Sequence, residues 1–301
     1  MHTKAFPYIG LLSLFWGTNI VASRFGIDEF DPYLFIALRL SIATFFFVLI
    51  FFFQRRTWPT DLNLWRHAAF SGVIGVSIPM TLFILSLQYQ SSGVTSIFVT
   101  TSPALMVVAA HLFLPDEKMT RNKVLGVVLA LSGSLFLVLR GESGLADVSR
   151  ASSLGFTLIF IGLCTDVANA IFVRRRMRHM DPMAVTGIRL SVGALITIIV
   201  ALLVSNFSWA GITPAGYFSL AYAALIGALG GQFLAFYITR RFGATAFSLT
   251  SYLVPIIATS FGVLVLGEIV TWGMLIGVLL IGGGIYLINR RAYIHNRRVL
   301  S

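Results

Sequence analysis

The chain has 301 residues, of which 57% are hydrophobic and 11% are charged, whereas soluble proteins average roughly 25% charged residues. This composition excludes a soluble domain and indicates an integral membrane protein. The formal net charge of +11 does not indicate a nucleic-acid partner, because Lys and Arg fall in short clusters between apolar segments instead of forming one basic face.

The hydrophobic segments have the length of membrane-spanning helices, each of which needs roughly 20 mostly apolar residues. They are continuously apolar and do not alternate with polar residues, so the pattern excludes a β-barrel and favours helices. Ten spans are predicted in chain order, at about 7–25, 33–53, 67–88, 94–114, 122–140, 153–173, 184–204, 217–239, 245–266 and 271–289.

Positive charges give these spans an orientation, because cytoplasmic loops of membrane proteins carry an excess of Lys and Arg. Seventeen of the 22 Lys and Arg fall on one side of the predicted membrane and two fall inside spans. The other three, Arg24, Arg140 and Arg150, fall on the opposite side. We therefore expect both termini in the cytoplasm.

The chain also contains an internal repeat. Residues 31–41 read DPYLFIALRLS and residues 181–191 read DPMAVTGIRLS, an offset of 150. Near the end of each half, Gly126 aligns with Gly277 and Gly133 with Gly284 at an offset of 151. We expect two five-helix repeats, 1–150 and 151–301, that together form one membrane domain. Because five is an odd number, the second repeat enters the membrane inverted, as in secondary transporters.

The stretch from Phe242 to Leu287, FGATAFSLTSYLVPIIATSFGVLVLGEIVTWGMLIGVLLIGGGIYL, resembles the EamA-type repeat of the drug/metabolite transporter superfamily. In that repeat a helix with a mid-span proline precedes a Gly-Glu turn and a glycine-rich last helix. The matching residues are Pro255, Gly267, Glu268, Gly277 and Gly284. The first half is similar, with FWGTNIVASRFGI near its start and Pro103 and Glu117 further on. It departs at residues 115 and 116, where Pro-Asp replaces the usual glycine.

The resemblance implies an exporter of small metabolites in a bacterial inner membrane, with no cofactor. One intramembrane acid, several aromatic residues and few buried cations favour an amino-acid-like, cationic or amphipathic substrate. An uncoupled channel or a lipid scramblase remains an alternative. An intramembrane enzyme is the third, although the sequence lacks an HExxH metal motif, paired intramembrane carboxylates or a membrane Lys near Ser.

Asp166 is the leading candidate functional residue, because a carboxylate in mid-span costs about 2.5 to 3.5 kcal/mol and should face water or a partner. It is predicted to bind a substrate ammonium or to relay protons; a structural hydrogen bond is the alternative. At the offset of 150 its counterpart is Trp16, so the repeats differ at equivalent depth. Asn19 and Asn169 lie one helical turn further, where they line the repeat interface or act as packing contacts.

The predicted cavity combines these positions with polar residues of spans eight and nine. The substrate-binding candidates are Trp16, Asn19, Asp166, Asn169, Gln232, Tyr237, Ser251 and Tyr252. Pro103 and Pro255, each beside hydroxyl residues, are predicted hinges or ordinary packing bends.

The remaining candidates are structural. Arg39 and Arg189 are expected to brace their spans or to snorkel towards the headgroups, although one of them could attract a substrate carboxylate. Gly273 and Gly277 have the small-residue spacing that packs membrane helices, which predicts a repeat interface or a homodimer. Glu117 and Glu268 are expected to cap or brace the helices that follow them, and His111 is expected to pack or to lie at the interface.

Overall fold

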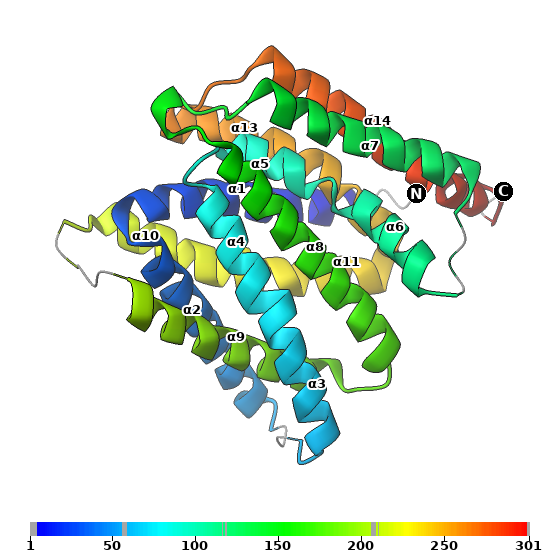
Figure 1. Ribbon diagram of the computed structural model, residues 1–301. Helices are drawn as coiled ribbons and strands as arrows, with labels where there is room; N and C mark the ends of the chain where they lie inside the picture. The colour runs from blue at the N-terminus through cyan, green and yellow to red at the C-terminus, as the bar shows by residue number, and fades with distance from the viewer. Residues whose placement is uncertain are drawn as a thin grey trace. The chain divides into compact units, whose positions relative to one another are not determined.

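The computed structural model describes residues 5–55, 59–115, 117, 119–205, 209 and 211–299 (Figure 1). In these ranges the fold is all-helical. The α-helices are α1 Phe6–Glu29, α2 Pro32–Phe53, α3 Leu62–Gly72, α4 Ile78–Ser86, α5 Ser92–Val99, α6 Ser102–Phe113, α7 Arg121–Arg140, α8 Ser153–Arg176, α9 Pro182–Val204, α10 Pro214–Tyr222, α11 Gly231–Phe242, α12 Ala244–Ser248, α13 Thr250–Leu266 and α14 Trp272–Val299. Two π-helical segments, η2 Val73–Ser77 and η4 Ala223–Gly230, and a 3-10 turn, η3 Val148–Arg150, complete the elements.

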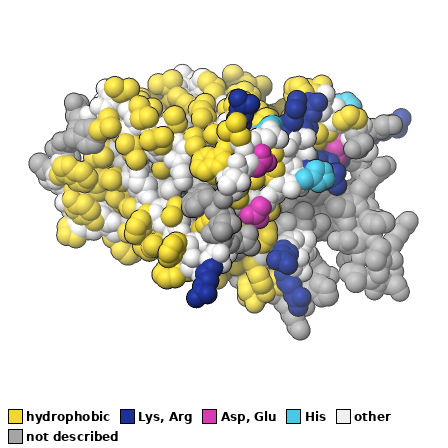
Figure 2. Space-filling model, turned by 90° about the horizontal axis from the view of Figure 1, so that it is seen from below, with side chains coloured by type: hydrophobic (Ala, Val, Ile, Leu, Met, Phe, Trp, Pro, Cys, Tyr) yellow, Lys and Arg dark blue, Asp and Glu magenta, His cyan; other side chains and the backbone are white. Residues whose placement is uncertain are grey.

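The predicted membrane spans are confirmed. In the described part of the chain, ten helical segments are long and apolar enough to cross a bilayer, from Phe6–Glu29 to Trp272–Asn289. Large apolar side chains such as Phe52, Leu203 and Leu264 are 75 to 80% exposed, as expected for residues that face lipid. Figure 2 shows hydrophobic side chains over much of the visible described surface, with charged side chains gathered in one part of it.

Arg24, which the charge distribution places on the side opposite the cytoplasm, lies in the second half of α1 and is only 6% exposed. Its Nη1 donates to Asp28 Oδ2 at 2.6 Å, one helical turn away. The ion pair keeps this buried charge neutralised within α1.

The repeated Asp-Pro pair begins equivalent helices. Asp31 caps α2 by accepting hydrogen bonds from the backbone N–H groups of Tyr33 and Leu34, at 3.0 and 3.2 Å. Asp181 caps α9 by accepting from the N–H of Ala184 at 3.0 Å. The proline takes the first helical position, where its missing N–H costs nothing. The most visible sequence repeat is therefore a duplicated helix start.

The chain packs into two compact units that cut across the predicted repeats. One unit contains residues 1–21, 89–156 and 230–301, and the other contains residues 22–88 and 157–229. Each unit combines equivalent helices from both halves of the sequence. We call them the first unit and the second unit, and each is described by itself.

In the first unit, α7 packs along α14 (Figure 1). Their backbones approach closely at Gly126 and Gly284, because a Cβ added to either one would lie 2.5 Å from the carbonyl oxygen of the other. Gly277 of α14 packs against Leu137 of α7, and Gly273 packs against Glu142. The glycine faces are thus occupied within the chain, which is the close packing that small residues permit in membranes.

In the second unit, α9 packs against α2 and α3. Thr44 Oγ1 of α2 donates to the carbonyl oxygen of Leu190 in α9 at 3.1 Å. Gly72 at the end of α3 lies against the backbone of Arg189, where a Cβ would be 2.8 Å from the Arg189 carbonyl oxygen. Helices of the two repeats therefore interlock here too.

Several spans are interrupted. The π-helical segments η2 and η4 begin at Val73 and Ala223, an offset of 150, so both repeats carry this irregularity at the same depth. The fourth span breaks between α5 and α6, and the ninth breaks between α12 and α13. Pro103 lies in the first turn of α6, directly after the break, whereas Pro255 lies inside α13.

The first prediction concerns the α7–α14 contact. Gly284→Ala places a Cβ against the Gly126 carbonyl, so the backbones have to separate, and we expect a loss of stability of about 1 to 3 kcal/mol. The measurement is thermal unfolding of the purified protein in detergent. Gly282→Ala on the same helix is the matched control, because its Cβ would meet nothing closer than 3.9 Å. Equal melting temperatures for the two variants would contradict the close approach.

Candidate functional site

The second unit contains a pair of opposite charges in its spanning helices. Asp166 lies in α8 and is exposed, and Arg189 lies in α9 and is half-buried. The two side chains interact electrostatically. Within the described residues, however, neither makes a direct hydrogen bond or ion pair with the other. An exposed carboxylate in a spanning helix has to face water or a polar partner, because hydrocarbon does not solvate it.

Arg189 reaches the irregular part of the third span. Its Nη2 lies 3.5 Å from the carbonyl oxygen of Gly75 in the π-helical segment η2, which is a long contact. Its Nε is buried and has no hydrogen-bond partner among the described residues. The guanidinium therefore keeps donors that the protein does not use.

Asn169 supports this region from α8. It is 4% exposed, and its Oδ1 accepts a hydrogen bond of 2.6 Å from Ser71 Oγ in α3. Its amide also packs directly on Gly75, where any Cβ would overlap it. Asn169 thus fastens α8 to the third span. We call Ser71, Gly75, Asp166, Asn169 and Arg189 the Gly75 cluster.

The predicted cavity residues of the first half of α1 and of spans eight and nine lie in the first unit. Trp16 is half-buried, its indole Nε1 lies against Gly231, and its ring meets Phe247 edge to face at 5.8 Å between centroids. Asn19 is buried in α1. The structure therefore joins Trp16 to two residues that the sequence analysis did not select.

The other candidates of the first unit have separate surroundings. Gln232 and Tyr237 of α11 are exposed, and the ring of Tyr237 lies 5.1 Å from that of Tyr8. Ser251 and Tyr252 of α13 are half-buried, and the ring of Tyr252 would be 3.9 Å from a Cβ added at Gly282. These residues are placed, but their role in binding is still a prediction.

Ser251 has a structural function through its backbone. Its carbonyl oxygen faces the position of the missing N–H of Pro255, four residues later. Thr100 Oγ1, which donates to the Ser96 carbonyl oxygen at 2.8 Å, also lies 3.4 Å from the Ser251 carbonyl oxygen, and Thr100 stands at the break between α5 and α6. The two interrupted spans thus contact each other through a carbonyl that proline frees.

Arg39 and Arg189 occupy equivalent sequence positions but differ in environment. Arg39 is 3% exposed, and its Nη1 donates to Ser23 Oγ at 3.0 Å. This burial fits the bracing role predicted for Arg39 and is incompatible with snorkelling to the headgroups. At the offset of 150, Val173 stands in place of Ser23. Arg189 lacks that hydroxyl and contacts the Gly75 carbonyl instead.

The contact made by Glu268 was not predicted from the sequence. We expected this residue to brace the helix after it, but its carboxylate binds the start of α5, in the other repeat. Oε1 accepts from the backbone N–H of Ser92 at 2.7 Å, and Oε2 accepts from Ser92 Oγ at 2.6 Å and from the N–H of Gly93 at 3.4 Å. A carboxylate at a helix N-terminus satisfies free N–H groups and complements the helix dipole.

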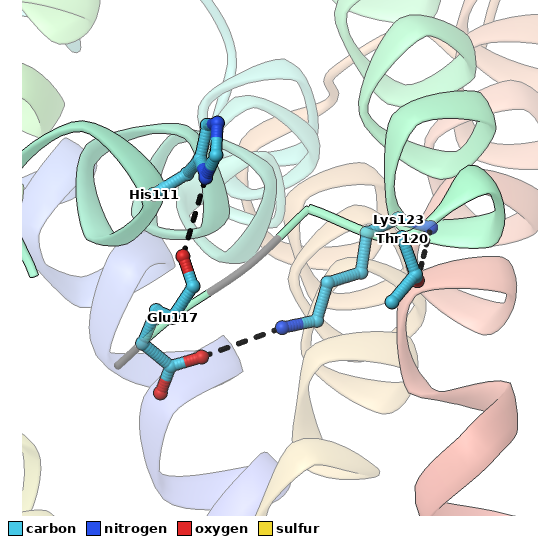
Figure 3. A network of polar contacts seen from close by, with 4 residues as sticks. All are labelled: His111, Glu117, Thr120 and Lys123. Carbon is cyan, nitrogen blue, oxygen red and sulfur yellow. Dashed lines mark hydrogen bonds and ion pairs between the residues drawn. The ribbon is translucent and has the colours of Figure 1, made fainter. Parts of the chain in front are cut away.

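Glu117 has the expected role of bracing the helix that follows it (Figure 3). Its Oε2 lies 3.4 Å from Lys123 Nζ at the start of α7, where Thr120 Oγ1 also accepts from the Lys123 backbone N–H at 3.4 Å. The ring Nδ1 of His111 lies 3.2 Å from the carbonyl oxygen of Glu117. His111 is exposed at the end of α6, as expected for an interfacial position.

Metal coordination finds no support in the described residues, where no group of three or more His, Cys, Asp or Glu side chains could hold an ion. Asp166 and Arg189 keep hydrogen-bonding capacity that the described residues do not use.

Ten span-length helices of the described chain, built from two similar halves, define a polytopic membrane protein of the transporter class. The model of the EamA-like transporter family matches residues 4–139 and 153–290. The chain therefore belongs to the EamA-like transporter family, which confirms the resemblance to the drug/metabolite transporter superfamily. This is a family of transporters and not of enzymes.

Relatives cover nearly the whole chain. The "Uncharacterized transporter YoaV" of Bacillus subtilis is 29% identical over 93% of this chain and 95% of its own length. The "Probable amino-acid metabolite efflux pump" of Salmonella typhimurium is 27% identical over 92% of both chains. A solved crystal structure with 18% identity matches 97% of this chain and 100% of its own, with a TM-score of 0.67, which supports the fold alone.

The second prediction concerns Glu268. Glu268→Ala removes the acceptors of Ser92 and Gly93, and hydrogen bonds to a charged group contribute about 1.5 to 3 kcal/mol. We expect a lower melting temperature of the purified protein, with Glu268→Gln intermediate because its amide oxygen still accepts. Asp61→Asn is the control, since either residue caps a helix well. A Glu268→Ala variant as stable as this control would contradict the capping role.

Proposed function

We propose that this protein is a secondary transporter that exports small metabolites from the bacterial cytoplasm across the inner membrane. It works by alternating access between its two inverted repeats, with both termini in the cytoplasm. Membership of the EamA-like transporter family supports transport. The orientation rests on the distribution of Lys and Arg in the sequence.

The substrate is amino-acid-like, cationic or amphipathic. The observation that carries this proposal is the exposed carboxylate of Asp166 within the spanning helix α8, which attracts a positively charged group. One relative is named as a probable amino-acid metabolite efflux pump, which agrees with a substrate that carries an ammonium group. The same carboxylate is our candidate for coupling export to proton entry.

A homodimer through α7 and α14 is part of the proposal. Since the glycines of these helices face each other within one chain, a dimer would have to use their outer faces. The outer face of α7 carries the exposed residues Leu125, Val128, Leu135 and Leu139.

A metabolite screen tests the export function. Cells that overproduce the protein are compared with control cells for the solutes in medium and cytoplasm, and the enriched solute is then followed in proteoliposomes. Saturable flux that responds to a pH gradient supports a coupled exporter. Flux that increases linearly with solute concentration indicates a channel, and transfer of labelled lipid between leaflets indicates a scramblase.

The third prediction concerns coupling. Asp166→Asn replaces the carboxylate in mid-span of α8 with an amide that cannot bind and release a proton, so we expect proton-driven accumulation of the solute in proteoliposomes to fall at least about tenfold. Asp61→Asn removes a carboxylate outside the predicted spans and is expected to keep the wild-type rate. Wild-type accumulation by Asp166→Asn would exclude Asp166 as the relay.

A further inference from the structure

The Gly75 cluster holds opposite charges that do not neutralise each other directly. A closed Arg–carboxylate pair has N···O distances of about 2.7 to 2.9 Å and is often bidentate. Asp166 and Arg189 interact electrostatically, yet no such direct contact joins them in the described structure. The pair is therefore open.

An open pair inside a membrane span is costly unless something else satisfies its charges. The protein supplies little. Arg189 has one contact of 3.5 Å to the Gly75 carbonyl and a buried Nε without a partner, and Asp166 accepts no hydrogen bond from the described residues. Both groups keep their capacity for a ligand, and the ligand that satisfies both carries one charge of each sign.

The surroundings hold the arginine in place. The backbone of Arg189 packs on Gly72, and the adjacent Gly75 is fastened to α8 by the Asn169 amide, itself bonded to Ser71 at 2.6 Å. Asp166 lies one helical turn before Asn169 on the same face of α8. The helices that carry the two charges are thus connected through the third span, which limits how far the charges can close on each other.

We propose that Asp166 and Arg189 together bind a zwitterionic α-amino acid in the second unit, with its ammonium on Asp166 and its carboxylate on Arg189. The planar guanidinium suits a carboxylate, and an ammonium suits a single acid. This inference rests on the proposed export function and adds a second charge requirement to it. An ammonium-only cation uses half of the site.

The test measures downhill transport of three charge forms in proteoliposomes without a pH gradient, so that loss of proton coupling does not affect the comparison. Each of the twenty common L-amino acids is screened first, and the best is then compared with its amide, which keeps the ammonium alone, and its N-acetyl derivative, which keeps the carboxylate alone. We expect the wild-type protein to transport the amino acid at least about tenfold better, in kcat/KM, than either derivative, since a site built for a polar group strongly disfavours analogues that lack it.

Two substitutions test the two charges of the site separately. Asp166→Asn is expected to lose transport of the amino acid and to transport the N-acetyl derivative as well as or better than the wild type. Arg189→Gln is expected to lose transport of the amino acid and to transport the amide as well as or better than the wild type. Arg66→Gln, which changes an exposed arginine of α3, is the control expected to keep the wild-type order. This crossed preference is a result that loss of a merely structural ion pair does not produce.

Folding is checked by melting temperature and size-exclusion profile. If Arg189→Gln does not fold, Arg189→Lys is used, which keeps the positive charge but not the planar pair of N–H donors. We then expect weaker transport of the amino acid and no gain in transport of the amide. Equal losses for all three charge forms in both variants would overturn the proposal, as would a wild-type preference for the amide. A wild type that transports none of the twenty amino acids but moves another metabolite overturns this inference alone, whereas no saturable solute flux overturns the proposed function.

Discussion

A chain inside a bilayer has to satisfy its own backbone, because hydrocarbon offers no hydrogen bonds. This protein interrupts several of its spans, and polar groups at these interruptions and at helix starts contact residues of the other repeat. Thr100 Oγ1 of the first half lies 3.4 Å from the Ser251 carbonyl oxygen that Pro255 leaves free, and Glu268 of the second half accepts from the backbone N–H of Ser92 at the start of α5. In the second unit, Glu29 Oε2 accepts from the Thr213 N–H at 2.8 Å, and Arg189 contacts the Gly75 carbonyl. Neither half is therefore self-sufficient, and each compact unit draws on both.

The spans were predictable because hydropathy is a local property of the sequence. Their ends agree with the structure to within five residues, and the Asp-Pro starts are caps that act within four residues. Glu268 was harder to interpret, since its partners in α5 are 176 residues away and follow from packing. The partner of Arg24 is local, since Asp28 lies one turn further along α1. Local patterns fixed the elements, and long-range contacts decided what their polar residues do.

The candidate site shows the same division. Asp166 could be selected from the sequence because a carboxylate in mid-span is expensive wherever it points. Arg189 could not be separated from Arg39, since the two share an Arg-Leu-Ser motif. Their difference lies in their neighbours: Ser23 meets Arg39, whereas the equivalent Val173 offers no acceptor and Arg189 is left with Gly75. Identical residues at equivalent positions thus acquire different chemistry from neighbours that diverged between the repeats.

This divergence bears on how a duplicated chain makes a selective site. Inverted repeats provide two equivalent positions, and identical residues there would present the same chemistry twice. Here one position holds Trp16, which fills its surroundings against Gly231 and Phe247, and the other holds the exposed Asp166. Gly162 lies one turn before Asp166 on α8, and a Cβ added to it would make an ordinary contact of 3.4 Å with Leu82 of α4, so α8 packs on α4 beside the charge. The chain keeps the shared helix architecture and changes the side chain, so that a charged group is present in only one of two equivalent places.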